Sequence, residues 1–343
     1  MGVKRALWLA TALWAWDSAY GAQSSCKIAQ IAEWHVDRVQ NRPIVEGQIN
    51  GQSIHILIDT GTGHSYIAEA AAWKLGLPVR QSNDRRAFTV GGIVQVKTTV
   101  IDHLKVGTFD GDNLRFDVIN TTPLPGVDFM LGADFFWHFA TEFDLANGKV
   151  RILQPTDCKP EQLVYWGQSY FVANLERMTS DDAEIDVYTD LNGSHAKATL
   201  DTGSPISFAS TLSARAAGVK SDDAGLAAAP SVKGVGGSTI PTWIGRFDTF
   251  AIGDETIRNA KLRIGDLYIL GGQWNRVMAK RELILGCDFL MAHRVIVQPR
   301  EHVMVFSYNG GPVFQLIHPD DATQGDPADG LLPAPPQPTA EGG

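Results

Sequence analysis

The chain has 343 residues, 44% of them hydrophobic and 20% charged, which is the composition of a globular protein with one large or two ordinary domains. Its net charge is -9 at pH 7, and it has no run of lysines or arginines, so it lacks the basic surface that binding to nucleic acid or to an anionic membrane requires. We therefore expect neither kind of partner.

The N-terminus has the pattern of a signal peptide. Lys4 and Arg5 form a basic start, residues 6–16 form an apolar run, and residues 19–21 match a small-residue cleavage pattern. The apolar run is too short to be a membrane-spanning helix, and no later stretch is long and apolar enough to be one. We expect residues 1–21 to be removed, the rest not to insert in a membrane, and the protein to be exported, either periplasmic or extracellular.

The cysteines predict one disulfide. Cys287 lies in the apolar segment LILGCDFLM, which is typical of a small buried thiol. Export permits a disulfide, and Cys26 and Cys158 are then the expected pair. No cysteine or histidine pair has the spacing of a metal site, so we expect no metal and no cofactor. Neither a GxSxG motif, a P-loop nor a GxGxxG sequence is present, which argues against the commoner hydrolases and nucleotide-binding proteins.

An internal repeat organises the chain. Residues 50–76 align without a gap on residues 192–218, with an offset of 142, and LGADFF at 131–136 corresponds to LGCDFL at 285–290. Unrelated sequences seldom share such landmarks in one order, so we infer a duplication. The repeat predicts these segments: a signal peptide (1–21), an N-terminal segment (22–41), a first lobe (42–155), a connector (156–183), a second lobe (184–317) and a disordered proline-rich tail (318–343).

Each copy is predicted to be mostly β structure. Residues 43–49 and 53–58 alternate in polarity and are joined by Asn50-Gly51, a strong hairpin signal that recurs at Asn192-Gly193. Further along, each copy has an alanine-rich helix, a hairpin with a glycine pair, and a short buried strand. These elements are expected at 68–75 and 209–217, at 85–98 and 231–246, and at 129–131 and 283–285. The pattern predicts an all-β fold with two pseudo-symmetric lobes, short helices and a cleft between the lobes.

The repeat also places one aspartate, Asp59 or Asp201, after the same apolar strand of each copy. Peptide hydrolysis without a metal or a covalent nucleophile needs a base that activates water and an acid that polarises the carbonyl. Two adjacent carboxylates that share one proton provide both. A single Asp-Thr-Gly is a weak signal, since it is often a plain turn, but two at equivalent positions are a strong one. Asp134 and Asp288 also repeat, yet each begins a helical turn, where a structural role is expected.

The residues that follow each aspartate are expected to support the pair. Backbone N–H groups in the tight glycine turns can hold the carboxylates, and the hydroxyls of Thr62 and Ser204 are expected to donate to their outer oxygens. Thr60 and Thr202 offer hydroxyls that can lock one turn to the other. The predicted supporting residues are Thr60, Gly61, Thr62, Thr202, Gly203 and Ser204.

The motifs IDTGTG and LDTGSP, the glycine pairs and the LG landmarks resemble those of retropepsin-like aspartic peptidases, with two copies fused in one chain. The resemblance covers about residues 42–155 and 184–308. It implies that Asp59 and Asp201 are catalytic and that the threonines after them bond across the lobes. It also implies flaps that close over the peptide, which carry Gly91, Gly92, Gly236 and Gly237.

One departure from symmetry bears on the substrate pockets. Pro205 follows the second DTGS, whereas Gly63 follows the first DTGT, so the two half-sites are not equivalent. We expect an aspartic endopeptidase that hydrolyses peptide or protein substrates as a monomer, because two lobes in one chain remove the need for a dimer. The alternatives are a non-catalytic peptide-binding protein that keeps the cleft, and a repeat that serves only as a structural interaction module.

Overall fold

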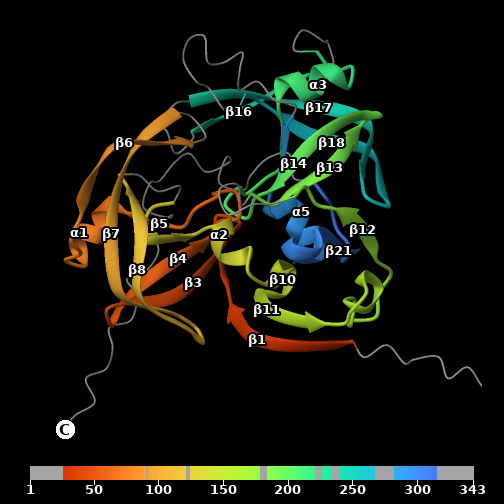
Figure 1. Cartoon of the computed structure of the whole chain (residues 1–343). Coiled ribbons are helices and arrows are strands. Elements are labelled where there is room, and N and C mark those ends of the chain that lie inside the picture. Colours follow the sequence, from red (N-terminus) through yellow and green to blue (C-terminus); the bar gives the residue numbers. More distant parts are fainter. Residues whose placement is uncertain are drawn as a thin grey trace, which may run out of the picture.

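The computed structural model describes residues 26–89, 92–120, 124–177, 184–220, 226–233, 239–266 and 282–314. The predicted signal peptide, the proline-rich tail and three of the four flap glycines (Gly91, Gly236 and Gly237) lie outside these residues. The described chain forms three β-sheets joined by short helices (Figure 1). The predicted all-β, bilobal fold is confirmed.

The first copy forms an eight-stranded sheet, which we call the first sheet, in the order β2-β3-β4-β9-β5-β8-β7-β6. An additional pairing between β3 and β7 folds this sheet over on itself. Its elements are β2 (Asp37–Val39), β3 (Arg42–Ile49), β4 (Gln52–Ile58), β5 (Tyr66–Ala68), α1 (Glu69–Lys74), β6 (Arg80–Thr89), β7 (Gly92–Val106), β8 (Phe109–Ile119), β9 (Phe129–Leu131) and α2 (Ala133–Phe136).

The second copy repeats this arrangement in a seven-stranded sheet, the second sheet, in the order β13-β14-β19-β15-β18-β17-β16. A pairing between β13 and β17 closes it in the way that β3 and β7 close the first. Its elements are β13 (Asp186–Leu191), β14 (Ser194–Leu200), β15 (Phe208–Ala209), α3 (Thr211–Ala216), β16 (Ala227–Lys233), β17 (Thr239–Ile252), β18 (Glu255–Ile264), β19 (Glu282–Leu285) and α5 (Cys287–Ala292).

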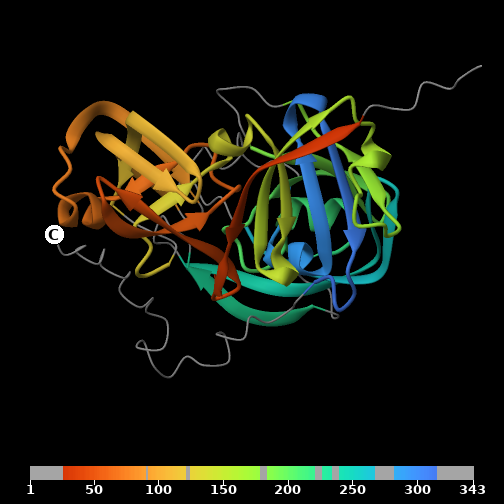
Figure 2. The same cartoon turned by 90° about the horizontal axis from the view of Figure 1, so that it is seen from below.

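A six-stranded sheet, the shared sheet, takes strands from both copies and lies beside the first two in both views (Figures 1 and 2). At its centre β10 of the first copy pairs with β20 of the second, with Phe143 opposite Val295. Its order is β1-β11-β10-β20-β21-β12. Its strands and turns are β1 (Lys27–His35), β10 (Ala140–Asp144), η1 (Leu145–Asn147), β11 (Lys149–Thr156), β12 (Phe171–Asn174), β20 (His293–Gln298), η3 (Pro299–Glu301) and β21 (Val303–Tyr308).

The Asn-Gly hairpins and the alanine-rich helices form where the sequence predicts them. Asn50 and Gly51 have φ of 49° and 76°, and Asn192 and Gly193 have the same values, so both hairpins turn through residues that tolerate a positive φ. The helices α1 and α3 form at the two alanine-rich stretches. Each copy therefore reaches its buried central strand by the same hairpin.

The connector packs on the outer face of the shared sheet instead of hanging free. Its 3-10 turn η2 (Pro160–Gln162) leads into Leu163 and Val164, which are buried in a small core with strands of this sheet. The predicted disulfide between Cys26 and Cys158 is present and ties the start of β1 to the connector. Among the described residues, no helix is long and apolar enough to cross a membrane.

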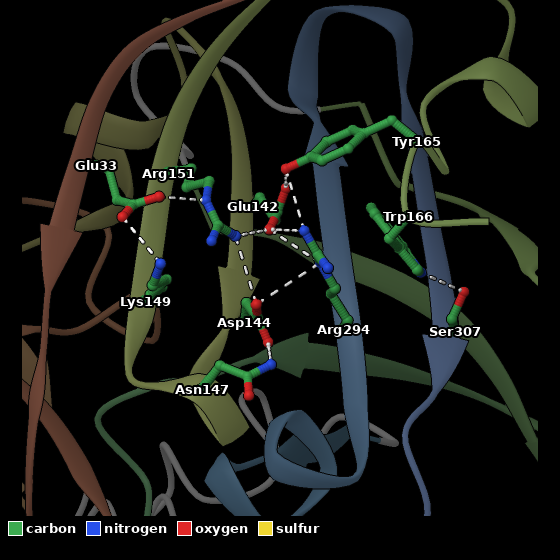
Figure 3. Close-up of polar contacts among 10 residues, drawn as sticks. All are labelled: Glu33, Glu142, Asp144, Asn147, Lys149, Arg151, Tyr165, Trp166, Arg294 and Ser307. Atoms are coloured by element: carbon green, nitrogen blue, oxygen red, sulfur yellow. Dashed lines mark hydrogen bonds and ion pairs between the residues drawn. The ribbon is translucent and has the colours of Figure 1, made fainter. Parts of the chain in front are cut away.

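A network of charges lies between the connector and the shared sheet (Figure 3). Glu142 of β10 is fully buried and accepts hydrogen bonds from Arg151 of β11, from Arg294 of β20, with Nε at 3.0 Å, and from the hydroxyl of Tyr165. Burial and the bond to Glu142 raise the pKa of Tyr165 to about 12. The Arg294 guanidinium also lies over the ring of Trp166, 4.3 Å from its centre. Since β10 and β20 come from different copies, the network joins the lobes through paired charges.

Candidate active site

Asp59 and Asp201 lie at the ends of corresponding central strands. β4 runs parallel to β9, and the Asp59 N–H continues this pairing by donating to the Leu131 carbonyl at 3.0 Å. β14 runs parallel to β19, and the Asp201 N–H donates to the Leu285 carbonyl at 2.9 Å. Each aspartate is therefore held at its backbone by a buried strand before its side chain enters the site.

Thr60 and Thr202 lock the two turns together crosswise. The Thr60 hydroxyl donates to the Leu200 carbonyl at 2.6 Å and accepts from the Thr202 N–H at 3.1 Å. The Thr202 hydroxyl donates to the Ile58 carbonyl at 2.7 Å and accepts from the Thr60 N–H at 3.0 Å. Both threonines are fully buried. Each hydroxyl thus satisfies two backbone groups, both of which belong to the other copy.

The glycines of the two turns allow the carboxyl groups to meet. A Cβ added at Gly61 would lie less than 3.0 Å from the Asp201 carboxyl group, and one added at Gly203 would lie as close to the Asp59 carboxyl group. Real Cβ atoms essentially never approach so closely. Each aspartate therefore packs against the turn of the other copy, which brings the two carboxyl groups close together.

The two carboxyl groups are not equivalent. The pKa of Asp59 is raised from 3.8 to about 8, first by burial and then by the charge of Asp201, against the opposing effects of Arg42 and the Gly61 N–H. Burial also raises the pKa of Asp201, but its Oδ1 accepts from the N–H groups of Gly203 at 2.8 Å and Ser204 at 3.0 Å, which oppose the rise. Hydrogen bonds to a carboxylate favour its ionised form. The larger number of N–H donors at Asp201 therefore favours its ionised form and favours the proton on Asp59.

The hydroxyls of Thr62 and Ser204 do not make the bonds that the sequence predicts. The Thr62 hydroxyl donates to the His64 carbonyl at 3.3 Å, and the Ser204 hydroxyl donates to the Ile206 carbonyl at 2.8 Å. Both bonds join a side chain to the backbone two residues on, a local contact that competes with longer-range partners. Ser204 still contacts Asp201, but through its backbone N–H.

Two serines that the sequence analysis missed, Ser65 and Ser207, connect the segment after each Asp-Thr-Gly turn to the following buried strand and helix. The Ser65 hydroxyl donates to Asp134 at 2.7 Å and accepts from the Gly132 N–H at 2.9 Å. In the second copy, the Ser207 hydroxyl donates to Asp288 at 2.6 Å and accepts from the Gly286 N–H at 2.9 Å. The serines share the offset of 142 with the aspartates, which is the signal that identifies them. Asp134 and Asp288 therefore have a structural role.

Another missed contact comes from the turn before β3. Arg42 Nε donates to the Gly203 carbonyl at 2.7 Å, and Asn41 Nδ2 donates to the Pro205 carbonyl at 2.6 Å. Both residues belong to the first copy, whereas both carbonyls follow Asp201. No motif marks them, because the contact depends on how the two copies pack.

The two glycine-pair segments form long hairpins. β6 pairs with β7 as far as Thr89 and Gly92, and β16 pairs with β17 as far as Lys233 and Thr239. The residues between each pair of strands lie outside the described chain, so the role of these hairpins as flaps stays a prediction.

Within the described residues, one group has the composition of a metal site: His103, Asp110 and Asp112 on β7 and β8. The Nδ1 of His103 lies 2.6 Å from Asp112, and its Nε2 lies 3.2 Å from Asp110. A hydrogen bond to Asp112 raises the pKa of His103. An imidazolium between two carboxylates accounts for this geometry, so the group carries no argument for a metal.

A comparison with protein families agrees with the duplicated architecture. A family model described as "Aspartyl protease" matches residues 45–135 and again residues 187–289, once in each copy. No curated protein matches the chain.

Proposed function

The chain belongs to the aspartyl protease family, in a retropepsin-like form with two fused copies, and from this premise we propose that it is an endopeptidase whose catalytic pair is Asp59 and Asp201. One observation carries the proposal: two carboxyl groups from equivalent turns meet at the contact between the copies, each packed against the glycine of the other turn, and the pKa of both is raised. Asp201 keeps partial exposure, which gives water and substrate access to the pair.

The roles follow from which carboxyl group carries the proton. Asp201 takes a proton from a water molecule whose oxygen attacks the peptide carbonyl, while Asp59 gives its proton to the carbonyl oxygen. The product of this step is a tetrahedral diol, with Asp201 now protonated and Asp59 ionised. In the next step Asp201 protonates the amide nitrogen, the C–N bond breaks, and Asp59 recovers a proton from the diol. Both carboxyl groups then have their starting charges.

The surroundings of the pair fit this chemistry. The raised pKa of Asp59 keeps one acid available near neutral pH, and the backbone N–H groups around Asp201 keep the other group ionised. The two glycine-pair hairpins would close over a bound peptide and exclude bulk water. The site needs no second chain, since both aspartates come from one, and we propose that the protein acts as a monomer.

We also propose that the protein is exported from the cytosol. The disulfide between Cys26 and Cys158 supports a periplasmic or extracellular location, because disulfides persist in oxidising compartments and are rare in the cytosol. The signal-peptide pattern in residues 1–21 points the same way.

The decisive experiment is a peptide-library digest with wild type, Asp59→Asn and Asp201→Asn in parallel, over a range of pH. Each substitution removes a carboxyl group that the mechanism needs, so each should abolish most of the activity, and the double variant should lose little more. Asp112→Asn, at an exposed carboxylate of the first copy, is the matched control and should cleave like wild type. Full activity of Asp201→Asn would contradict the mechanism. A wild type that binds peptides without cleaving them would support the peptide-binding alternative.

A further inference from the structure

The turn between β2 and β3 reaches from the first copy into the active-site turn of the second. Val39 pairs with Arg42, so the turn consists of Gln40 and Asn41, which have φ of 47° and 58°. Two consecutive positive φ values match a two-residue hairpin turn, and they are unusual for a glutamine. The turn therefore holds a defined shape, and it directs Asn41 and Arg42 toward the backbone that follows Asp201.

Arg42 acts on Asp201 through a single peptide group. The Gly203 carbonyl and the Ser204 N–H are the two ends of one peptide. Arg42 Nε donates to this carbonyl at 2.7 Å, while the N–H donates to Asp201 Oδ1 at 3.0 Å. A cationic donor on the carbonyl polarises the peptide, and hydrogen bonds in such a chain strengthen one another. Arg42 therefore improves the donor that stabilises the ionised form of Asp201.

The second copy has an acidic residue at the position that corresponds to Arg42. In β3 and β4, Ile44 lies opposite Leu57, and in β13 and β14 Asp186 lies opposite Thr199. The residue numbers of the second pair are those of the first pair plus 142. By the same offset, the residue of the second copy that corresponds to Arg42 is Glu184. A glutamate has no guanidinium group with which to donate to a carbonyl as Arg42 does. The duplication thus supports one aspartate of the pair in a way that it does not support the other.

We propose that Arg42 is a positioning residue that assigns the two roles in the pair: by holding and polarising the Gly203–Ser204 peptide, it makes Asp201 the base and leaves the proton on Asp59. This inference rests on the proposed peptidase function and adds to it a residue outside the Asp-Thr-Gly motifs. Asn41 holds the next stretch of the same turn through the Pro205 carbonyl.

The charges around the pair agree with this role. The positive charge of Arg42 lowers the pKa of both carboxyl groups. Among the described residues, Tyr66 and Cys287 also interact with the pair, and for both, burial first and the aspartate charges second raise the pKa, so both are neutral. Within the part of the chain that the structure describes, Arg42 is therefore a cation that acts on both carboxyl groups.

The test compares Arg42→Met, which keeps most of the side-chain volume without the charge, with Arg42→Lys, which keeps the charge without the planar fork. Arg38→Met on the same hairpin is the control, because Arg38 is exposed and contacts Met291 Sδ at 3.5 Å instead of the active-site turn. For Arg42→Met we expect kcat about tenfold lower with KM little changed. We also expect the acidic and the alkaline limb of the pH–activity profile to move to higher pH by about one pH unit. Each aspartate loses a nearby positive charge that lowers its pKa, so both pKa values rise.

The pH–activity profile of Arg42→Lys should stay near that of wild type, and the profile of Arg38→Met should overlay it. A profile of Arg42→Met that overlays wild type, or an equal shift in Arg38→Met, would overturn the proposal. If Arg42→Met does not fold, Arg42→Gln removes the charge while it keeps a donor, and the same shift of the limbs is expected.

A second measurement separates this inference from the peptidase function. NMR titration of carbon-labelled aspartates follows the pair without any substrate, and the resonances of Asp59 and Asp201 are assigned by their loss in the two Asn variants. A titration that moves to higher pH in Arg42→Met supports the role of Arg42 even if wild type cleaves nothing, in which case the peptidase proposal alone fails. If wild type cleaves peptides and neither the titration nor the profile moves, the Arg42 proposal alone fails.

Discussion

Replacing Thr202 with valine tests how strongly the crosswise bonds hold the two lobes together. Valine has nearly the shape of threonine, so the change removes the hydroxyl and leaves little cavity. The Ile58 carbonyl loses its donor at 2.7 Å, and the Thr60 N–H loses its acceptor at 3.0 Å. Thr60 and Thr202 are both fully buried, so water does not replace the lost partners. At roughly 1 to 3 kcal/mol for each unsatisfied buried group, we expect the free energy of unfolding to fall by about 2 to 6 kcal/mol.

The measurement is equilibrium unfolding in denaturant, followed by tryptophan fluorescence and by circular dichroism to check that the two transitions coincide. Thr202→Ser keeps the hydroxyl and should recover most of the loss. Thr189→Val is the matched control, because Thr189 is also buried but donates one side-chain bond, to the Ala196 carbonyl at 2.9 Å. It should cost about half as much as Thr202→Val. If the two valine variants lose equal stability, the crosswise arrangement contributes no more than an ordinary buried threonine.

Two further predictions concern the disulfide and the shared proton. The double variant Cys26→Ser/Cys158→Ser should have a free energy of unfolding about 2 to 4 kcal/mol lower than that of wild type, and wild type in reductant should unfold like the double variant. Unchanged unfolding in both would exclude a stabilising bond. Because the pKa of Asp59 is about 8 when folded and about 3.9 when unfolded, the folded state binds more protons between these values, and stability falls as pH rises through this window. Asp59→Asn should flatten that slope by up to about 1.4 kcal/mol per pH unit; parallel curves for the two proteins would refute the assignment.

The repeated elements and the place of the candidate pair can be predicted from the amino-acid sequence. Asn50-Gly51 and Asn192-Gly193 specify their hairpins because few other residues accept positive φ at both turn positions. The apolar strand before each Asp-Thr-Gly and the offset of 142 are enough to place Asp59 and Asp201 at equivalent turns. Such signals can be read from the chain because they depend on dihedral preferences and on contacts between near neighbours.

The differences between the two halves of the site depend on how the folded chain packs, and the local sequence does not predict them. The sequence predicts that the Ser204 hydroxyl donates to Asp201, but in the folded turn it donates to the Ile206 carbonyl. The bond from Arg42 to the Gly203 carbonyl joins residues 161 positions apart. No local sequence pattern in either segment predicts this bond. Which carboxyl group keeps the proton depends on burial, on the number of N–H groups at each oxygen and on the nearest cation, all of which arise from packing one copy against the other.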